Sequence, residues 1–208
     1  MKSEFAISEV LPGKLNAMVK NIMGQMKIDD PNEAVRRVNA GEWVVSRVVK
    51  SILRLISGSK EIVISATAGG RTIAEAKGIF TGGIDRDFVN WDLNTPNEAR
   101  PKTPVEVHEM VEDDNFKAIF DSFNRSLDDL CFTQDQIITF IEDHKDWLRR
   151  NGYGTFFLMK KNGKFFVVYV TLDSDERPHA FVYHLSNAYL WSADYRRRVV
   201  VPQLALES

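Results

Sequence analysis

The sequence predicts an α+β protein in which N-terminal helices and a short strand region precede helices packed on a C-terminal antiparallel sheet. Three observations lead to this fold class. Apolar residues recur at helical spacing in the first part of the chain, helix-start signatures recur through the middle, and apolar side chains alternate as in strands after residue 153. At 208 residues and 44% hydrophobic composition, the chain can bury a sizeable core.

Two helices are expected near the N-terminus. Residues 15–26 place leucine, valine, isoleucine and methionine side chains on one helical face. Asp30 and Glu33 have the spacing of a capping box, with Pro31 suited to the first helical position and Gly41 to the end.

Residues 43–56 fit a strand or a helix. Their β-branched valines favour a strand, whereas apolar residues at 45, 48, 49, 52 and 56 share a helical face. A helix here would carry Arg47, Lys50 and Arg54 on its other side, a basic face suited to an acidic partner, a nucleic acid or a membrane. The solvated outer face of a core helix is the simpler interpretation.

The segment 94–104 contains three prolines and is the predicted linker. It separates a mainly helical lobe, 1–93, from an α+β lobe, 105–208, unless the whole chain forms one domain. Beyond it, Thr103 and Glu106 predict a helix start, and residues 116–123 carry an apolar helical stripe. Thr133 and Gln136 form another capping box, opening a helix that Gly152 would end.

The last third predicts a β-meander. Asn162-Gly163 suits a two-residue hairpin turn that pairs Lys161 with Lys164 and makes both faces of the hairpin apolar. Residues 177–185 should add a third antiparallel strand, 187–195 a short helix and 196–204 a final strand. Such a sheet is either covered on both sides or leaves one aromatic face open to a ligand or partner. The candidate contacts are aromatic: Phe156, Phe165, Tyr169, Tyr183 and Trp191.

No catalytic, metal or cofactor constellation is apparent in the sequence. His179 and His184 lie five apart in one predicted strand, so they should face opposite sides of the sheet. Asp85 and Asp87 lack the further ligands of a calcium loop, and Cys131 lacks a nearby basic residue to activate it. The single cysteine and the lack of a secretory signal or membrane span predict a soluble cytoplasmic protein.

The formal charge of −2 is unevenly distributed. Residues 1–60 sum to +4, residues 61–148 to −10 and residues 149–208 to +4. The negative charge of residues 61–148 argues against a nucleic acid bound around most of the protein surface, whereas either basic end of the chain could form a local patch. At the C-terminal end that patch would comprise Arg196, Arg197 and Arg198, of which at most two can lie on one side of a strand.

Gly69-Gly70 follows an apolar run, as a phosphate-binding turn often does. Neither the G-x-G-x-x-G pattern nor the P-loop lysine is present. Thr72 and Glu75 instead match a capping box, whose carboxylate would lie where a phosphate binds, or else the glycines form a hairpin turn.

Several segments resemble those of a family of short bacterial proteins, found mainly in candidate-phylum bacteria, that has no assigned function. They are "DPNEAVRRVNAGEWVVS" (30–46), "TIAEAKGIFTGGID" (72–85), "TPVEVHEMVED" (103–113), "FTQDQI" (132–137), "WLRRNGYGTFFL" (147–158) and "RRRVVVPQL" (196–204). The resemblance implies a bacterial cytoplasmic origin and provides no activity or site.

We therefore predict a non-catalytic binding protein with a protein partner rather than an enzyme. Two alternatives stay open: a nucleic-acid-binding protein that uses the basic segments, and a small enzyme acting on a nucleotide or phosphorylated ligand. The sequence does not set the oligomeric state.

Overall fold

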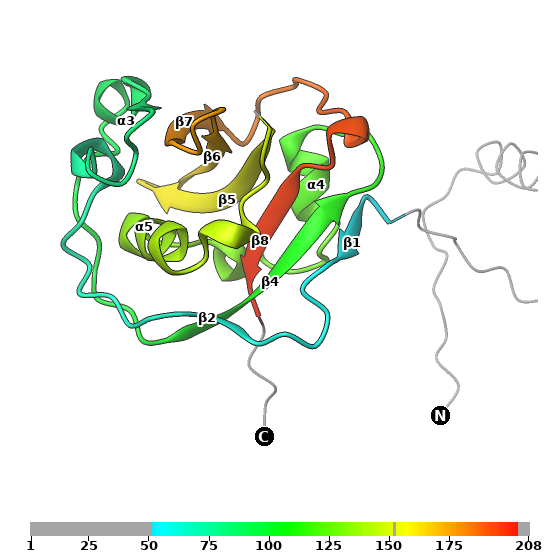
Figure 1. Ribbon diagram of the computed structural model, residues 1–208, viewed down its shortest axis with the longest axis horizontal. Coiled ribbons are helices and arrows are strands. Elements are labelled where there is room, and N and C mark those ends of the chain that lie inside the picture. The colour runs from blue at the N-terminus through cyan, green and yellow to red at the C-terminus, as the bar shows by residue number, and fades with distance from the viewer. Residues whose placement is uncertain (1–50, 152, 204–208) are drawn as a thin grey trace, which may run out of the picture. The chain divides into compact units, whose positions relative to one another are not determined.

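The computed structural model describes residues 51–151 and 153–203 (Figure 1). The chain divides into two units, residues 1–49 and 50–208, and all the described residues belong to the second. The helices expected at 15–26 and 30–41, together with Arg47 and Lys50, lie outside the described residues. The second unit is built around one mixed sheet of eight strands.

The strands run in the order β1-β4-β8-β5-β6-β7-β3, and β2 shares the outer edge of β4 with β1. Most neighbours are antiparallel, but β5 pairs in parallel with β8, and β3 in parallel with β7. The bounds are β1 Leu53–Leu55, β2 Ile62–Ile64, β3 Gly83–Ile84, β4 Thr103–Met110, β5 Gly154–Lys161, β6 Lys164–Leu172, β7 Pro178–His184 and β8 Arg198–Pro202.

The helices are short and lie between the strands. The α-helices are α3 Asp87–Asn90, α4 Phe116–Asp121 and α5 Gln134–Asp143. The 3-10 turns are η1 Ile73–Glu75, η2 Leu127–Leu130, η3 Lys145–Trp147 and η4 Ala193–Tyr195. Within the described ranges, none of these helices has the length and apolar character to cross a lipid bilayer.

The predicted fold class is wrong in its arrangement. The protein contains both helices and strands, but the described part is mostly strand, and its sheet is mixed rather than antiparallel. Strands from the predicted helical lobe, β1, β2 and β3, join the C-terminal strands in the same sheet. The predicted boundary at 94–104 stays a prediction, although β2 and β4, from either side of it, pair directly.

The largest difference between the predicted and the observed fold lies at β4. Thr103 and Glu106 match a helix start, yet residues 103–110 form a strand between β8 and the β1/β2 edge. Val105 and Val107 are buried while their neighbours are not, which is the alternation of a strand. Pairing along both edges and burial of the valines outweigh the local helix-start signature, because a capping box stabilises a helix by only about 1 kcal/mol.

Some of the other predicted helices are present in the structure, and some are shorter than predicted. The apolar stripe at 116–123 forms α4, and the capping box of Thr133 and Gln136 opens α5. α5 ends at Asp143 rather than at Gly152, and in 187–195 only η4 is helical. From the ambiguous segment 43–56, the described residues 53–55 form β1.

The β5–β6 hairpin is confirmed in turn, register and faces. Asn162 and Gly163 adopt φ values of 49° and 73°, as a two-residue turn requires, and Lys161 pairs with Lys164. The expected third antiparallel strand and the final strand are β7 and β8. β8 lies between β4 and β5 and buries three successive valines, Val199, Val200 and Val201. Successive side chains of a strand point to opposite faces, so these valines pack on both faces of the sheet.

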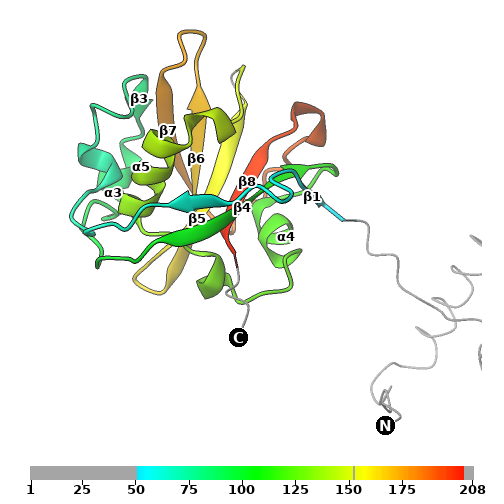
Figure 2. The same ribbon diagram turned by 60° about the horizontal axis from the view of Figure 1, so that its bottom comes forward.

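Both faces of the sheet are covered, so neither is an open aromatic surface. Figure 2 shows α5 and the segment around η1 and α3 on one side and α4 on the other. On the α5 side, Phe157, Met159, Phe166 and Val168 of the hairpin enter one core. On the α4 side, Phe156, Leu158 and Val167 enter the second. Covering both faces satisfies the requirement that a hairpin with two apolar faces imposes.

Candidate functional site

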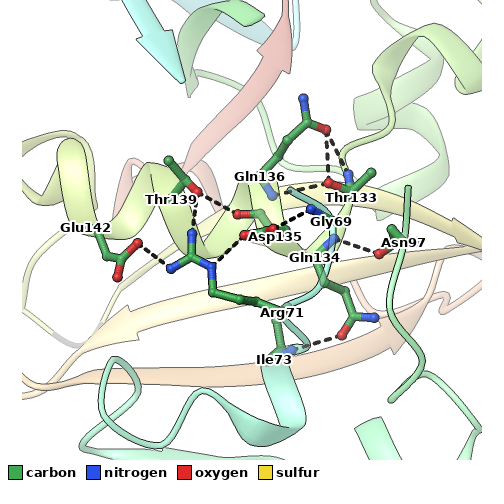
Figure 3. Close-up of polar contacts among 10 residues, drawn as sticks. All are labelled: Gly69, Arg71, Ile73, Asn97, Thr133, Gln134, Asp135, Gln136, Thr139 and Glu142. Atoms are coloured by element: carbon green, nitrogen blue, oxygen red, sulfur yellow. Dashed lines mark hydrogen bonds and ion pairs between the residues drawn. The ribbon is translucent and has the colours of Figure 1, made fainter. Parts of the chain in front are cut away.

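The glycine pair at 69–70 contacts the first turn of α5 (Figure 3). The Gly69 N–H donates to one oxygen of the Asp135 carboxylate at 2.8 Å, and Arg71 Nε donates to the other at 2.6 Å. The guanidinium of Arg71 also donates to the hydroxyl of Thr139 and the carboxylate of Glu142. Asp135 thus occupies the position that a bound phosphate would take.

Gln134 extends this network along the buried N-terminus of α5. Its side-chain oxygen accepts the Ile73 N–H at 3.0 Å, and its amide nitrogen donates to the carbonyl of Leu93 at 2.6 Å. Gln136 donates to the hydroxyl of Thr103 at 2.9 Å. These bonds fasten the segment between β2 and β4 onto α5.

The network around Gly69 is internal and leaves no place for a phosphate. The Asp135 side chain is only 3% exposed, and both of its oxygens have donors. Partial burial acts to lower the pKa of Arg71, but its hydrogen bonds to Glu142 and Asp135 raise that pKa overall. Gly69 has a φ of +83°, and a Cβ there would meet backbone atoms of residues 97 and 98. The glycine is therefore needed for close packing.

Four of the five predicted aromatic contacts meet in one cluster on the α4 side of the sheet. The Trp191 ring lies 5.2 Å from that of Phe156, 5.4 Å from Tyr169 and 5.9 Å from Tyr183 between centroids. Phe165 packs against the same core. Phe156 is fully buried, and burial raises the pKa of Tyr169. These rings stabilise the fold, because most of their surface is already covered.

The histidines do not converge. In β7, His179 contacts Asp173 and Phe181, whereas His184 packs on Trp91, so the two lie on opposite faces as expected. His144 follows α5, where its Nε2 lies 2.9 Å from the carbonyl oxygen of Val63. Within 51–151 and 153–203, no group of three or more histidine, cysteine or acidic side chains could hold a metal ion.

Asp85 and Asp87 stabilise the start of α3. The Asp85 carboxylate accepts the Asp87 N–H at 3.1 Å, and the Asp87 carboxylate accepts a hydrogen bond from the Asn90 side chain at 3.0 Å. This arrangement is a local turn, and it explains the short acidic motif without a ligand.

Cys131 is expected to be an unreactive thiol. Burial, followed by the nearby carboxylate of Asp128, raises the pKa of Cys131 to about 12. Because the thiolate is the nucleophile, its reaction with Ellman's reagent at neutral pH should be at least about 100-fold slower in the native protein than in denaturant. Stopped-flow absorbance measures both rates, and a native rate within a few-fold of the denatured one would contradict the placement of Cys131.

The parallel pairing of β5 with β8 brings two basic segments together. Thr155 lies opposite Arg198, so residues 148–151 and 153, which precede β5, lie beside residues 192–197, which precede β8, at the end of the sheet where both strands begin. Figure 2 shows this end of the sheet, where the β6–β7 turn also lies. We define the arginine–tyrosine edge by the residues that gather there: Arg149, Arg150, Tyr153, Tyr195, Arg196, Arg197 and Arg198.

Planar side chains are layered along this edge. The rings of Tyr153 and Tyr195 stack with centroids 4.6 Å apart and an angle of 13°. Arg149 lies over the Tyr153 ring at 5.8 Å, and Arg197 lies 4.7 Å from the Tyr195 ring and 4.8 Å from that of Trp191. Cation–π contacts and stacking therefore hold the guanidinium groups in fixed planes.

Four of these arginines have no carboxylate at ion-pair distance among the described residues: Arg149, Arg196, Arg197 and Arg198. The guanidinium of Arg198 faces the carbonyls of Asp146 and Leu148, and that of Arg197 donates to the carbonyl of Ser192. Burial, and then the charge of Arg149, lowers the pKa of Arg198. Their positive charge is thus only partly compensated.

An acidic segment borders the edge on one side. Residues 112–114 follow β4, and the Asp113 carboxylate accepts the Ala193 N–H at 2.7 Å. The Asp114 carboxylate accepts the N–H of Asn115. The acidic residues therefore offset positive charge next to β4, and the rest of the arginine–tyrosine edge stays positive.

The predicted basic residues are dispersed in the structure. Arg54 of β1 pairs with Glu109 at 2.7 Å. Arg196 is exposed with a left-handed φ of 48°, Arg197 is 7% exposed and Arg198 begins β8. Of the arginine triplet, Arg196 is exposed and can reach a ligand, whereas Arg197 lies against the rings of Tyr195 and Trp191. Arg198 is partly buried, with its guanidinium on the carbonyls of Asp146 and Leu148.

No family model, curated protein or solved structure matches this chain. The resemblance to short bacterial proteins therefore stays a prediction.

Four residues of the arginine–tyrosine edge were not predicted as site residues from the sequence: Arg149, Arg150, Tyr153 and Tyr195. A signal was present, because "RRNGY" and "DYRRR" each place arginines beside a tyrosine just before a strand. The two segments lie together only because β5 and β8 pair in parallel. The alternation of apolar residues within either strand does not indicate that pairing.

Proposed function

We propose that the protein is a non-catalytic binding protein that holds single-stranded nucleic acid at the arginine–tyrosine edge. The observation that carries this proposal is the stacked Tyr153–Tyr195 pair flanked by guanidinium groups that lack carboxylate partners. Sites for single strands combine cationic side chains for the backbone with aromatic or guanidinium planes for the bases. The arginine–tyrosine edge offers both.

Two partly exposed rings provide surfaces for bases: Tyr189 is the more open one, and Tyr195 offers the part of its ring that Tyr153 and Arg197 leave uncovered. Tyr195 is 41% exposed, and Tyr189, which precedes it on the same loop, is 61% exposed and contacts the Trp191 ring at 4.8 Å. Arg149 donates to the Tyr195 carbonyl and Arg196 follows Tyr195 directly, so both would contact phosphates. Arg198 lies nearby, where its guanidinium faces the carbonyls of Asp146 and Leu148, and it adds positive charge. The guanidinium plane of Arg149 adds a surface on which a base can stack.

The charge distribution favours a short single strand over a duplex. Residues 61–148 carry a net charge of −10, so a duplex extending across the unit would meet unfavourable charge. Contact confined to one edge involves few phosphates. The logarithm of the binding constant should then fall with the logarithm of salt concentration with a slope of about −2 to −3.

The test is fluorescence anisotropy with labelled single-stranded DNA and RNA at several salt concentrations. Arg149→Ala should weaken binding and make the salt slope shallower by about 0.7, because one phosphate contact is lost. Tyr195→Ala should lower affinity by about 1–3 kcal/mol with the slope unchanged, because it removes a stacking surface and no charge.

The matched control is Arg100→Ala. Arg100 is exposed, and its backbone pairs with Thr67 rather than with any residue of the arginine–tyrosine edge, so its loss should leave affinity unchanged. No binding at low salt, or equal losses for Arg100→Ala and Arg149→Ala, would refute the proposal. Tighter binding to an acidic polypeptide than to the oligonucleotides would identify a protein partner instead.

A further inference from the structure

The β6–β7 turn places one carboxylate against the basic edge. Glu176 forms an ion pair with Arg150, the one arginine of the edge that has a carboxylate partner among the described residues. The two side chains are 51% and 54% exposed, so solvent and solutes reach the pair. Glu176 thus neutralises a guanidinium that directly follows Arg149 in the chain.

The turn holds Glu176 in a conformation that a residue with a Cβ rarely adopts. Its φ is +57°, in the left-handed region. Asp173 fastens the turn, because its carboxylate accepts the N–H groups of Asp175 and Arg177, each at 2.9 Å. The Glu176 N–H donates to the Asp173 carbonyl at 3.0 Å. Surrounding hydrogen bonds therefore keep Glu176 at the tip despite its unfavourable backbone conformation.

A pocket of about 320 Å³ separates this turn from the segment that enters β5. Arg150 and Asn151 line it from one segment, and Asp173, Ser174 and Glu176 from the other. With Glu176 on Arg150, the pocket offers an incoming anion no free guanidinium. With Glu176 displaced, Arg150 would present its N–H donors beside Arg149.

Building on the proposed function, we propose that Arg150 is a further phosphate contact, which the Glu176 carboxylate occupies in the free protein and a phosphate of the bound strand displaces. An exposed ion pair is a weak interaction, so a phosphate with two acceptor oxygens and neighbouring contacts can compete with it. Glu176 would then lower affinity for every anion and favour strands that also engage the neighbouring tyrosines.

The experiment compares Glu176→Gln with Asp175→Asn in the full chain, using a labelled single-stranded oligonucleotide. Both variants remove one negative charge from the same turn, but Asp175 pairs with Arg177 and not with Arg150. Glu176→Gln should bind about two- to fivefold more tightly and steepen the salt slope by about 0.7, because Arg150 now releases a counterion. Asp175→Asn should bind as the wild type does.

Arg150→Ala completes the test. It should change wild-type affinity less than about twofold but reverse the gain in the Glu176→Gln background, because only there is Arg150 unoccupied before binding. Equal gains for Glu176→Gln and Asp175→Asn would overturn the proposal in favour of net charge. An unchanged Glu176→Gln, with Arg149→Ala still weakened, would overturn it and leave the proposed function standing. No binding by any variant would overturn both.

Discussion

Asp135→Ala is expected to lower the free energy of unfolding by about 2–4 kcal/mol. The carboxylate is 3% exposed and accepts hydrogen bonds from the Gly69 N–H and from Arg71. Its removal leaves a buried N–H without an acceptor, which costs about 1–3 kcal/mol, and frees the guanidinium that joins the 65–75 segment to α5. Urea denaturation measures the loss, and hydrogen exchange at Gly69 should locate it.

Glu142→Gln is the matched control for Asp135→Ala. Glu142 pairs with the same arginine but is 36% exposed, so its replacement should cost less than about 1 kcal/mol. If the arginine–tyrosine edge binds nucleic acid as proposed, both variants should retain that binding while they are folded, because Asp135 and Glu142 pair with Arg71 and not with the arginines of the edge. Equal losses of stability would contradict the internal role of Asp135.

The structure shows which parts of this fold local sequence can predict. The β5–β6 hairpin was predictable because Asn162-Gly163 and the alternating residues around it act within one short segment. β4 was not, because Thr103 and Glu106 provide a helix-start signature nearby, whereas the partners that make it a strand, β2 and β8, are far away in the chain. Pairing between distant segments decided the fold class.

The candidate site residues differ in the same way: local patterns identify some of them, and others depend on pairing between distant segments. The apolar aromatics chosen from the sequence fill the core on the α4 side, since alternation identifies buried residues more readily than exposed ones. Tyr153 and Tyr195 stack only because β5 and β8 run in parallel, a relation between segments more than 40 residues apart. Arg197, predicted as part of a basic patch, is buried against the rings of Trp191 and Tyr195.

Gly154→Ala is expected to destabilise the protein by about 3 kcal/mol. Gly154 begins β5, and a Cβ there would lie 1.8 Å from Cε2 of Tyr169. That ring cannot retreat without cost, because it packs against Phe156 at 5.3 Å and Trp191 at 5.4 Å. Gly78→Ala is the control: a Cβ there meets nothing within 4 Å, so stability should change by less than about 0.5 kcal/mol.

Whether the clash with Tyr169 is the cause can be decided by a double-mutant cycle. Tyr169→Ala alone should cost about 3–5 kcal/mol, because a large buried ring is lost. In that background the Cβ of Ala at 154 has room, so the double variant should be about as stable as Tyr169→Ala alone, with urea denaturation as the measurement. Additive losses would instead place the cost in the β5 backbone. The coupled result would mean that Gly154 leaves the space in which the Tyr169 ring packs against Phe156 and Trp191.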